Sequence, residues 1–249
     1  MQQAVLHHKK RLIAALGDTT QETILDYGCG YGDFIELLLS SSSAPKSIIA
    51  TDSSKKMIEK IQDRFADDIA KQIVTPKICT SPSELKEYQF NKIICQNVLE
   101  CVEHKVDFIN DFFALLMPQG LFILSHHDFD SAIYNSEHKE LTRKLIHYFS
   151  DTQQAWQAHC DGQMGRKIPG LIASSLFKDS AIHKTWRIVE KSFKPGTYGY
   201  LMAQGIIEVA KPAFDDEVLS LWLKNLEQKS QQGDYYFAID LVLAILRAN

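Results

Sequence analysis

Long apolar runs are missing from this sequence. No stretch approaches the roughly 18 consecutive apolar residues that a membrane-spanning helix needs. Before Gly17 there is also no apolar segment of the kind found in signal peptides. We therefore expect a cytoplasmic protein with no membrane partner.

Paired cysteines are missing as well. The chain has five cysteines, an odd number, and no two of them form a CxxC motif. A disulfide framework and a structural zinc site are both poor interpretations of such a set, which favours a reducing compartment. We expect no metal site.

An excess of basic charge is also absent. Lys and Arg together number 27 against 31 Asp and Glu, for a net charge of −4. No positive field exists to attract a phosphate backbone, so we expect no nucleic-acid partner. With 45% hydrophobic and 23% charged residues the composition is that of an ordinary globular protein.

The pattern that is present alternates short apolar runs with amphipathic ones. Strands are predicted at residues 23–27, 47–51, 73–79, 91–96 and 121–125, and helices at 5–16, 34–39, 54–65 and 106–116. This alternation is typical of an α/β protein with a doubly wound, mostly parallel sheet.

After residue 125 the alternation stops. We predict helices at residues 136–149, 152–159, 168–176, 199–209 and 215–231, and strands at 182–193 and 235–246. The expected fold is a seven-stranded sheet with a helical cap inserted after the fifth strand. We interpret residues 1–249 as one domain, with a cofactor-binding half (1–127), a cap for the substrate (128–180) and a C-terminal part that completes the sheet (181–249).

The most informative motif is Asp26-x-Gly28-x-Gly30-x-Gly32, between a predicted strand and a predicted helix. Glycines at such a turn permit unusual backbone angles and let a ligand touch the main chain. A dinucleotide fingerprint needs a glycine at position 33, which is Asp33 here, and its charge would repel a pyrophosphate. No P-loop Gly-Lys-Ser/Thr follows either.

Two carboxylates flank this loop. Asp26 ends the first strand and suits a cationic ligand, whereas Asp52 ends the second strand and can accept both hydroxyls of a ribose. S-adenosylmethionine carries an ammonium, a sulfonium and a ribose but no phosphate. The pattern therefore favours this cofactor.

These residues resemble the signature motifs of class I S-adenosylmethionine-dependent methyltransferases. The similarity covers about residues 20–127 and includes Gln96-Asn97-Val98-Leu99-Glu100 after the fourth strand and Leu116-Met117-Pro118-Gln119-Gly120 before the fifth. Where many relatives place an acid against adenine, this chain has Thr80 and Ser81. The resemblance assigns the cofactor to Asp26, Tyr27, Gly28, Cys29, Gly30, Gly32, Asp52, Ser53, Met57, Thr80, Ser81, Gln96, Asn97 and Val98.

The catalytic candidates follow the fifth strand. His127 could take a proton because histidine titrates near neutral pH, with Asp128 or Asp130 orienting it. For the acceptor we predict His126, Arg143, Arg166 and Tyr198, with the arginines suited to an acidic molecule. Neighbouring histidines on a strand point to opposite faces, which disfavours a shared metal.

The sequence is compatible with three functions. The leading one is methylation of a small molecule at N, O or C. A non-catalytic sensor or scaffold that binds the cofactor is the alternative. A nucleic-acid methyltransferase is disfavoured because the segment at Gln96-Asn97-Val98-Leu99 lacks the two prolines typical of base-amino methylation. The sequence leaves the oligomeric state open.

Overall fold

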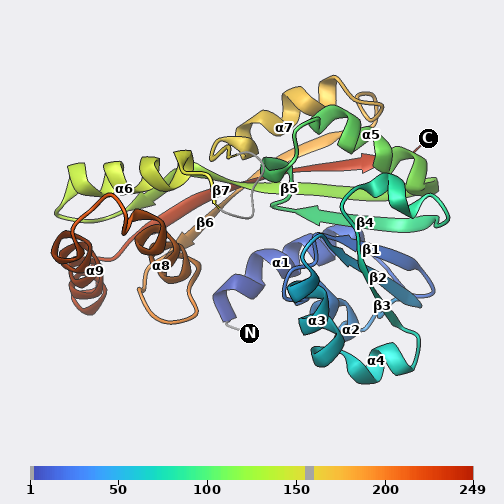
Figure 1. Ribbon diagram of the computed structural model, residues 1–249, viewed down its shortest axis with the longest axis horizontal. Coiled ribbons are helices and arrows are strands. Elements are labelled where there is room, and N and C mark those ends of the chain that lie inside the picture. Colours follow the sequence, from blue (N-terminus) through green and yellow to red (C-terminus); the bar gives the residue numbers. More distant parts are fainter. Residues whose placement is uncertain (1–2, 155–159, 249) are drawn as a thin grey trace.

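A single seven-stranded sheet forms the centre of the protein (Figure 1), whose computed structural model describes residues 3–154 and 160–248. The strand order is β3-β2-β1-β4-β5-β7-β6, and only β7 runs antiparallel to its neighbours. This confirms the predicted mostly parallel, doubly wound sheet. The strands are β1 (Thr23–Tyr27), β2 (Ser47–Asp52), β3 (Val74–Ile78), β4 (Phe90–Gln96), β5 (Leu116–Tyr134), β6 (Ile182–Glu190) and β7 (Phe237–Arg247).

Helices cover both faces of the sheet, as a doubly wound topology requires. No helix in the described part of the chain is long and apolar enough to cross a membrane. The helices are α1 (Gln3–Leu16), α2 (Asp33–Leu39), α3 (Lys55–Arg64), α4 (Ala66–Ala70), α5 (Lys105–Leu115), α6 (Lys139–Asp151), α7 (Met164–Ala173), α8 (Tyr198–Ala210) and α9 (Asp216–Gln231), with 3-10 turns η1 (Pro82–Leu85) and η2 (Leu99–Cys101).

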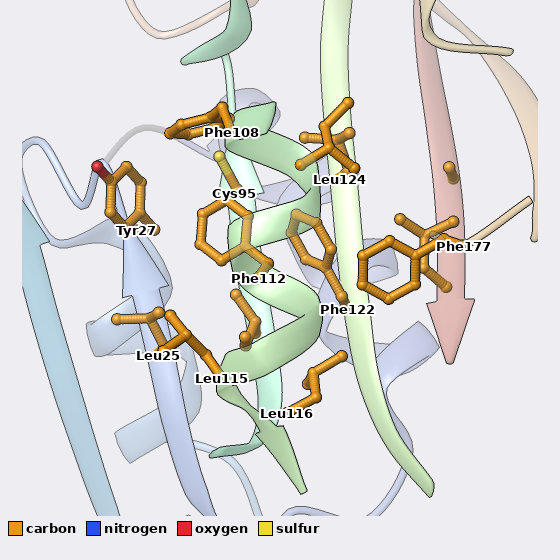
Figure 2. Packing of buried hydrophobic residues seen from close by; sticks show 14 of the residues in the cluster. Leu25, Tyr27, Cys95, Phe108, Phe112, Leu115, Leu116, Phe122, Leu124 and Phe177 are labelled. Carbon is orange, nitrogen blue, oxygen red and sulfur yellow. The ribbon is translucent and has the colours of Figure 1, made fainter. Parts of the chain in front are cut away.

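The central strands carry consecutive apolar residues because both of their faces are buried. Alternate side chains of β1 enter different cores, so Leu25 packs on the α5 side and Ile24 on the side of α1 and α2. Figure 2 shows Phe112 of α5 packed beside Tyr27 and Phe122. This packing fixes the carboxyl end of β1 and the loop that follows it.

A third core lies at the far ends of β5 and β7, where α6, α8 and α9 form a helical lobe (Figure 1, left). Its centre is Trp222, which is fully buried and donates a hydrogen bond from Nε1 to Thr142 Oγ1 at 3.0 Å. By contrast, α7 packs on β5 and β7 beside α5. The helices that follow β5 therefore pack in two places: α7 packs on the sheet, whereas α6, α8 and α9 form the lobe.

The strand β5 is much longer than the predicted 121–125. Its pairing contains two register shifts. Against β4 the shift lies between the partners of Phe90 and Lys92, and against β7 it lies between Asp128 and Ile133. Bulges of this kind interrupt the period-two alternation that a sequence pattern relies on. The residue Gln119, in the first shift, has a φ of 64°, a backbone angle that favours glycine.

Two further predicted elements need correction. Within the helix predicted at 152–159, residues 152–154 are not helical, and residues 155–159 lie outside the described part of the chain. The helix predicted at 168–176 begins earlier, as α7 at Met164. The short helix α4 was not predicted because five residues show too little periodicity.

Candidate functional site

A cavity of about 670 Å³ opens at the carboxyl ends of β1, β2 and β4. The strand order reverses between β1 and β4, and ligands of open α/β sheets bind at such a switch point. The residues predicted from the sequence that line this cavity are Tyr27, Gly28, Gly30, Asp52, Ser53, Met57, Thr80, Asn97 and Val98. Sequence reasoning missed its other lining residues: Tyr31, Ser54, Cys79, Glu100, Cys101, Val102 and Phe108.

The glycine loop needs glycine for different reasons along its length. A Cβ at Gly28, where φ is +73°, would lie 2.4 Å from Val98 Cγ2. At Gly30, where φ is +52°, nothing lies within 4 Å of such a Cβ, so a side chain there would enter the open cavity. The loop is held by the Gly28 and Cys29 amides, which both donate to Thr51 O at 2.8 Å.

The carboxylate of Asp52 ties the loop to the end of β2. Its Oδ2 accepts from the Gly30 amide at 3.0 Å, and its Oδ1 accepts from the Ser54 amide at 2.9 Å. The side chain therefore caps the chain entering α3 and also lines the cavity. Capping the chain and lining the cavity are compatible for this residue, because its two oxygens accept from amides on either side of the cavity wall.

The carboxylate of Asp26 lies beneath the same loop. It is 2% exposed, and its Oδ2 has no hydrogen-bond partner among the described residues. Burial raises the pKa of Asp26 to about 7, the nearby Lys9 opposes the rise, and Asp33 and Asp52 add to it. A buried, unpartnered carboxylate oxygen fits a cationic group of a ligand.

The predicted adenine side of the cavity is built differently from expectation. The hydroxyl of Ser81 caps η1 by accepting from Ser83 N at 3.3 Å, and Ser81 does not line the cavity. The hydroxyl of Thr80 donates to Glu84 Oε1 at 2.6 Å. Sequence reasoning missed Glu84, although Ser81-x-x-Glu84 is a readable capping box.

Of the other predicted cofactor residues, Asp26, Cys29, Gly32 and Gln96 do not line the cavity either. Gly32 instead ends the loop at the start of α2, and a Cβ on it would lie 2.6 Å from Phe65. Gly32 therefore contributes to the site by letting Phe65 pack closely against the loop.

Next to Asn97 lies a buried cluster of aromatic rings. The ring of His127 stacks on Tyr198, with centroids 4.7 Å apart and planes at 19°, and meets the edge of His8 at 5.2 Å. The Asn97 side chain reaches both the ring Nδ1 and the backbone amide of His127 at 2.9 Å. Three predicted residues thus come together, and His8 of α1 is an addition that the sequence did not signal.

Burial changes the expected chemistry of these histidines. It lowers the pKa of His127 well below 6.5, and the neighbouring His8, His126 and Lys9 lower it further. Burial likewise lowers the pKa of His126 to about 4. The prediction of an imidazole that titrates near neutral pH is therefore wrong: His127 is neutral at pH 7 because the charged ring would be desolvated.

Known proteins share sequence and fold with this chain. The family described as "Methyltransferase domain" matches residues 18–197, more than two thirds of the 249-residue chain. The chain belongs to this methyltransferase family. The match spans the glycine loop, Asp52, Asn97 and His127.

Three proteins similar to this methyltransferase illustrate the range of its relatives. A 37.1 kDa protein of a Streptomyces fradiae transposon is 25% identical over 174 residues, which cover 70% of this chain and 48% of that protein. This chain thus matches about half the length of that relative.

Solved structures share the fold. The YcgJ protein of Bacillus subtilis has a TM-score of 0.60 at 16% identity, covering 98% of this chain and 99% of that one. Geranyl diphosphate C-methyltransferase of Streptomyces coelicolor, solved with Mg²⁺, geranyl diphosphate and S-adenosylhomocysteine, has a TM-score of 0.53 at 12% identity, covering 95% and 78%.

The remaining predicted residues of this methyltransferase lie away from the cavity. Asp128 receives two hydrogen bonds of 2.6 Å from the Arg166 guanidinium, which also contacts Asp130 at 3.2 Å. Asp128 therefore faces an arginine of α7 instead of orienting His127. Arg143 is exposed and pairs with Glu140 at 2.8 Å on α6. Neither arginine lines the cavity.

Among the described residues, metal ligands do not gather at this site. In residues 3–154 and 160–248 no group of three or more His, Cys, Asp or Glu side chains is arranged to hold a metal ion. The pleat of β5 explains why His126 and His127 do not combine, since adjacent side chains of a strand point to opposite faces.

Proposed function

We propose that this chain transfers a methyl group from S-adenosylmethionine to a small molecule. One observation carries the proposal: Asp26, whose buried Oδ2 has no hydrogen-bond partner among the described residues, precedes the glycine loop, and the cavity-lining Asp52 binds that loop at Gly30, where it opens into the cavity. An anionic dinucleotide would meet repulsion from both acids, whereas a sulfonium nucleoside meets attraction.

Each end of the cofactor would have a partner in this arrangement. Asp26 would hold the ammonium group, and Asp52 would accept the ribose hydroxyls. Met57 and Thr80 would lie against the adenine. The Streptomyces coelicolor enzyme, whose structure contains S-adenosylhomocysteine, supports this choice of cofactor.

The chemistry is a direct displacement, for which the cofactor when bound supplies an electrophilic methyl group on a positively charged sulfur. A lone pair of the acceptor forms the new bond to the methyl carbon while the carbon–sulfur bond breaks and its electron pair stays on sulfur. The protein aligns the reactants and excludes water. His127, neutral and held by Asn97, would position the Asn97 side chain at the cavity and would not act as the base, because burial disfavours its charged form.

Replacing Asp52 tests the cofactor site. We expect Asp52→Ala to weaken binding of S-adenosylhomocysteine by about 1.5–3 kcal/mol for each charged hydrogen bond lost, as measured by calorimetric titration. Asp63→Ala, an exposed acid of α3, is the control and should bind as the wild type does. Unchanged affinity of Asp52→Ala would place the cofactor elsewhere.

Turnover separates an enzyme from a sensor or scaffold. The wild-type protein, incubated with S-adenosylmethionine and a metabolite pool, should yield a product heavier by one methyl group in mass spectrometry. Tight binding of S-adenosylhomocysteine with no methylated product would favour the sensor.

A further inference from the structure

The turn that follows β3, residues 79–81, borders the cavity through Cys79 and Thr80. The strand order β3-β2-β1 places this turn two strands away from Asp26, with Asp52 at the end of the strand between them. With the ammonium of the proposed cofactor at Asp26 and its ribose at Asp52, the base would extend to this turn.

One carboxylate oxygen collects the hydrogen-bond donors of the turn. Glu84 Oε1 accepts from the Thr80 amide at 3.0 Å, from the Ser81 amide at 3.0 Å and from the Thr80 hydroxyl at 2.6 Å. The hydrogen bond from the Thr80 hydroxyl, followed by those from the two amides, holds the pKa of Glu84 below its usual range. Glu84 is therefore ionised at neutral pH and acts only as an acceptor.

The donors of Cys79 are also used inside the protein. Its amide donates to Asp52 O at 3.1 Å, and its thiol donates to Ser81 O at 3.1 Å. The N–H, S–H and O–H groups of Cys79 and Thr80 are thus all directed at protein atoms. Toward a ligand, these two residues can offer only acceptors.

The hydroxyl of Thr80 determines which edge of a base suits the turn. A threonine hydroxyl has one proton and two lone pairs, and here the proton points to Glu84, so the oxygen can accept from a ligand but cannot donate to it. Adenine carries at this edge an amino group, which is a donor, beside the acceptor N1. Hypoxanthine carries a keto oxygen, which is an acceptor, beside a protonated N1.

Given the proposed binding of S-adenosylmethionine, we propose that the turn recognises the 6-amino group of the base and makes no hydrogen bond to N1. Thr80 Oγ1 accepts from the amino group, and Glu84 is the positioning residue that keeps the proton of Thr80 turned away from the ligand. A 6-keto base would place its oxygen against the lone pairs of Thr80. The pair Thr80 and Glu84 thus makes the site selective for adenosine over inosine.

A ligand series tests which atoms of the base are recognised. S-adenosylhomocysteine, S-inosylhomocysteine and the 1-deaza analogue of S-adenosylhomocysteine are titrated calorimetrically into the wild-type protein. We expect the inosyl ligand to bind about tenfold more weakly or worse, and the 1-deaza ligand, with C–H in place of N1, to bind within about threefold of the adenosyl ligand. A smaller difference for the inosyl ligand, or a larger loss for the 1-deaza ligand, would overturn the proposal.

Variants separate recognition of the base from folding of the turn, because Glu84 also belongs to the capping box of η1. Thr80→Val keeps the shape of the side chain and removes its oxygen, so the ratio of adenosyl to inosyl affinity should fall close to one. Glu84→Ala should also lower this ratio, since the released hydroxyl and amides can then donate to a keto oxygen. If Glu84→Ala weakened both ligands equally and left the ratio unchanged, its role would be structural and the proposal would be wrong.

Two further variants are controls for the charge of Glu84. Glu84→Gln retains an acceptor oxygen for Thr80 and should retain the preference for the adenosyl ligand. Glu87→Ala removes a neighbouring exposed acid, which pairs with Lys77 at 3.0 Å, and should leave the affinity ratio unchanged. Loss of the preference in Glu84→Gln, or an equal loss in Glu87→Ala, would contradict the role assigned to Glu84.

The titration of the wild type with S-adenosylhomocysteine keeps this proposal separate from the proposed function. Absence of binding would overturn the proposed function and the base recognition together. Tight binding without a preference between the adenosyl and inosyl ligands would overturn the base recognition alone.

Discussion

Two buried polar residues of the candidate site, Asp26 and His127, are both driven toward their neutral forms. Burial raises the pKa of the carboxyl and lowers that of the imidazole, since it penalises whichever form carries charge. For Asp26 the neutral form has a consequence for binding. A ligand ammonium prefers the ionised carboxylate, so binding and deprotonation are coupled.

We expect the affinity for S-adenosylhomocysteine to rise between pH 6 and pH 8. With the pKa of Asp26 at about 7, roughly a tenth of the carboxyl is ionised at pH 6, so binding should weaken there by up to about tenfold. Calorimetry in buffers of different ionisation enthalpy should show proton release at pH 6. In Asp26→Asn the affinity should be weak and no longer depend on pH in this way; a retained dependence would assign it to another group.

The raised pKa of Asp26 also affects stability: affinity for the ligand rises with pH, whereas the stability of the ligand-free protein falls. The raised pKa means that, between about pH 4 and pH 7, the folded protein binds more protons at Asp26 than the unfolded chain does. This residue therefore makes the ligand-free protein less stable as pH rises through that window.

Among the elements, β5 has the most varied set of contacts. Its middle pairs with β4 and β7 in the sheet, and its last residues reach into the helical lobe. Where it leaves β4, Asp128 binds the Arg166 guanidinium and the Arg166 amide. A Cβ at Gly165 would lie 2.9 Å from Asp128, so glycine lets α7 approach the strand. These contacts join α7 to the sheet.

Asp128→Ala should destabilise the protein by about 1–3 kcal/mol. The substitution removes charged hydrogen bonds from a side chain that is 3% exposed, although the half-exposed Arg166 keeps part of its hydration. Urea denaturation measures the change. Arg143→Ala, which breaks an exposed pair with Glu140, should change stability by less than about 0.5 kcal/mol. Equal losses in the two variants would contradict the assigned difference.

At the scale of the whole molecule, the sheet organises three cores. Two lie on its opposite faces, and the third unites α6, α8 and α9 with the ends of β5 and β7. The cavity of about 670 Å³ belongs to the parallel half, whereas a second one, of about 300 Å³, lies where β5 reaches the lobe. The two cavities thus lie on different parts of the fold, and Glu100 lines both.

A ligand that binds only the folded state should stabilise the whole chain. At a concentration 100 times its Kd, S-adenosylhomocysteine should add about 2.7 kcal/mol, which for a protein of this size raises Tm by roughly 5–10 °C. Differential scanning fluorimetry measures the shift. NADH at the same concentration should give none, because Asp33 stands where a dinucleotide fingerprint needs glycine. A larger shift with NADH would reverse the choice of cofactor.

The sequence by itself determined the parallel half of the fold. The predicted boundaries of β1 match the structure, and Asp26, the glycines and Asp52 were all placed at strand ends. Local patterns suffice there because buried parallel strands and tight turns each demand particular residue types over a few positions. The same reasoning failed for β5, whose bulges break the alternation, and for α4, which is too short to show a period.

Only the tertiary structure decided which polar residues meet. His8 and Tyr198 lie far apart in the chain yet pack on the ring of His127, and Arg166 reaches Asp128 from another element. The sequence could propose His127 as a group that titrates near neutral pH, but burial sets that pKa, and burial is a property of the packed molecule. For the same reason the second cavity became visible only once α6 and α8 were placed against β5.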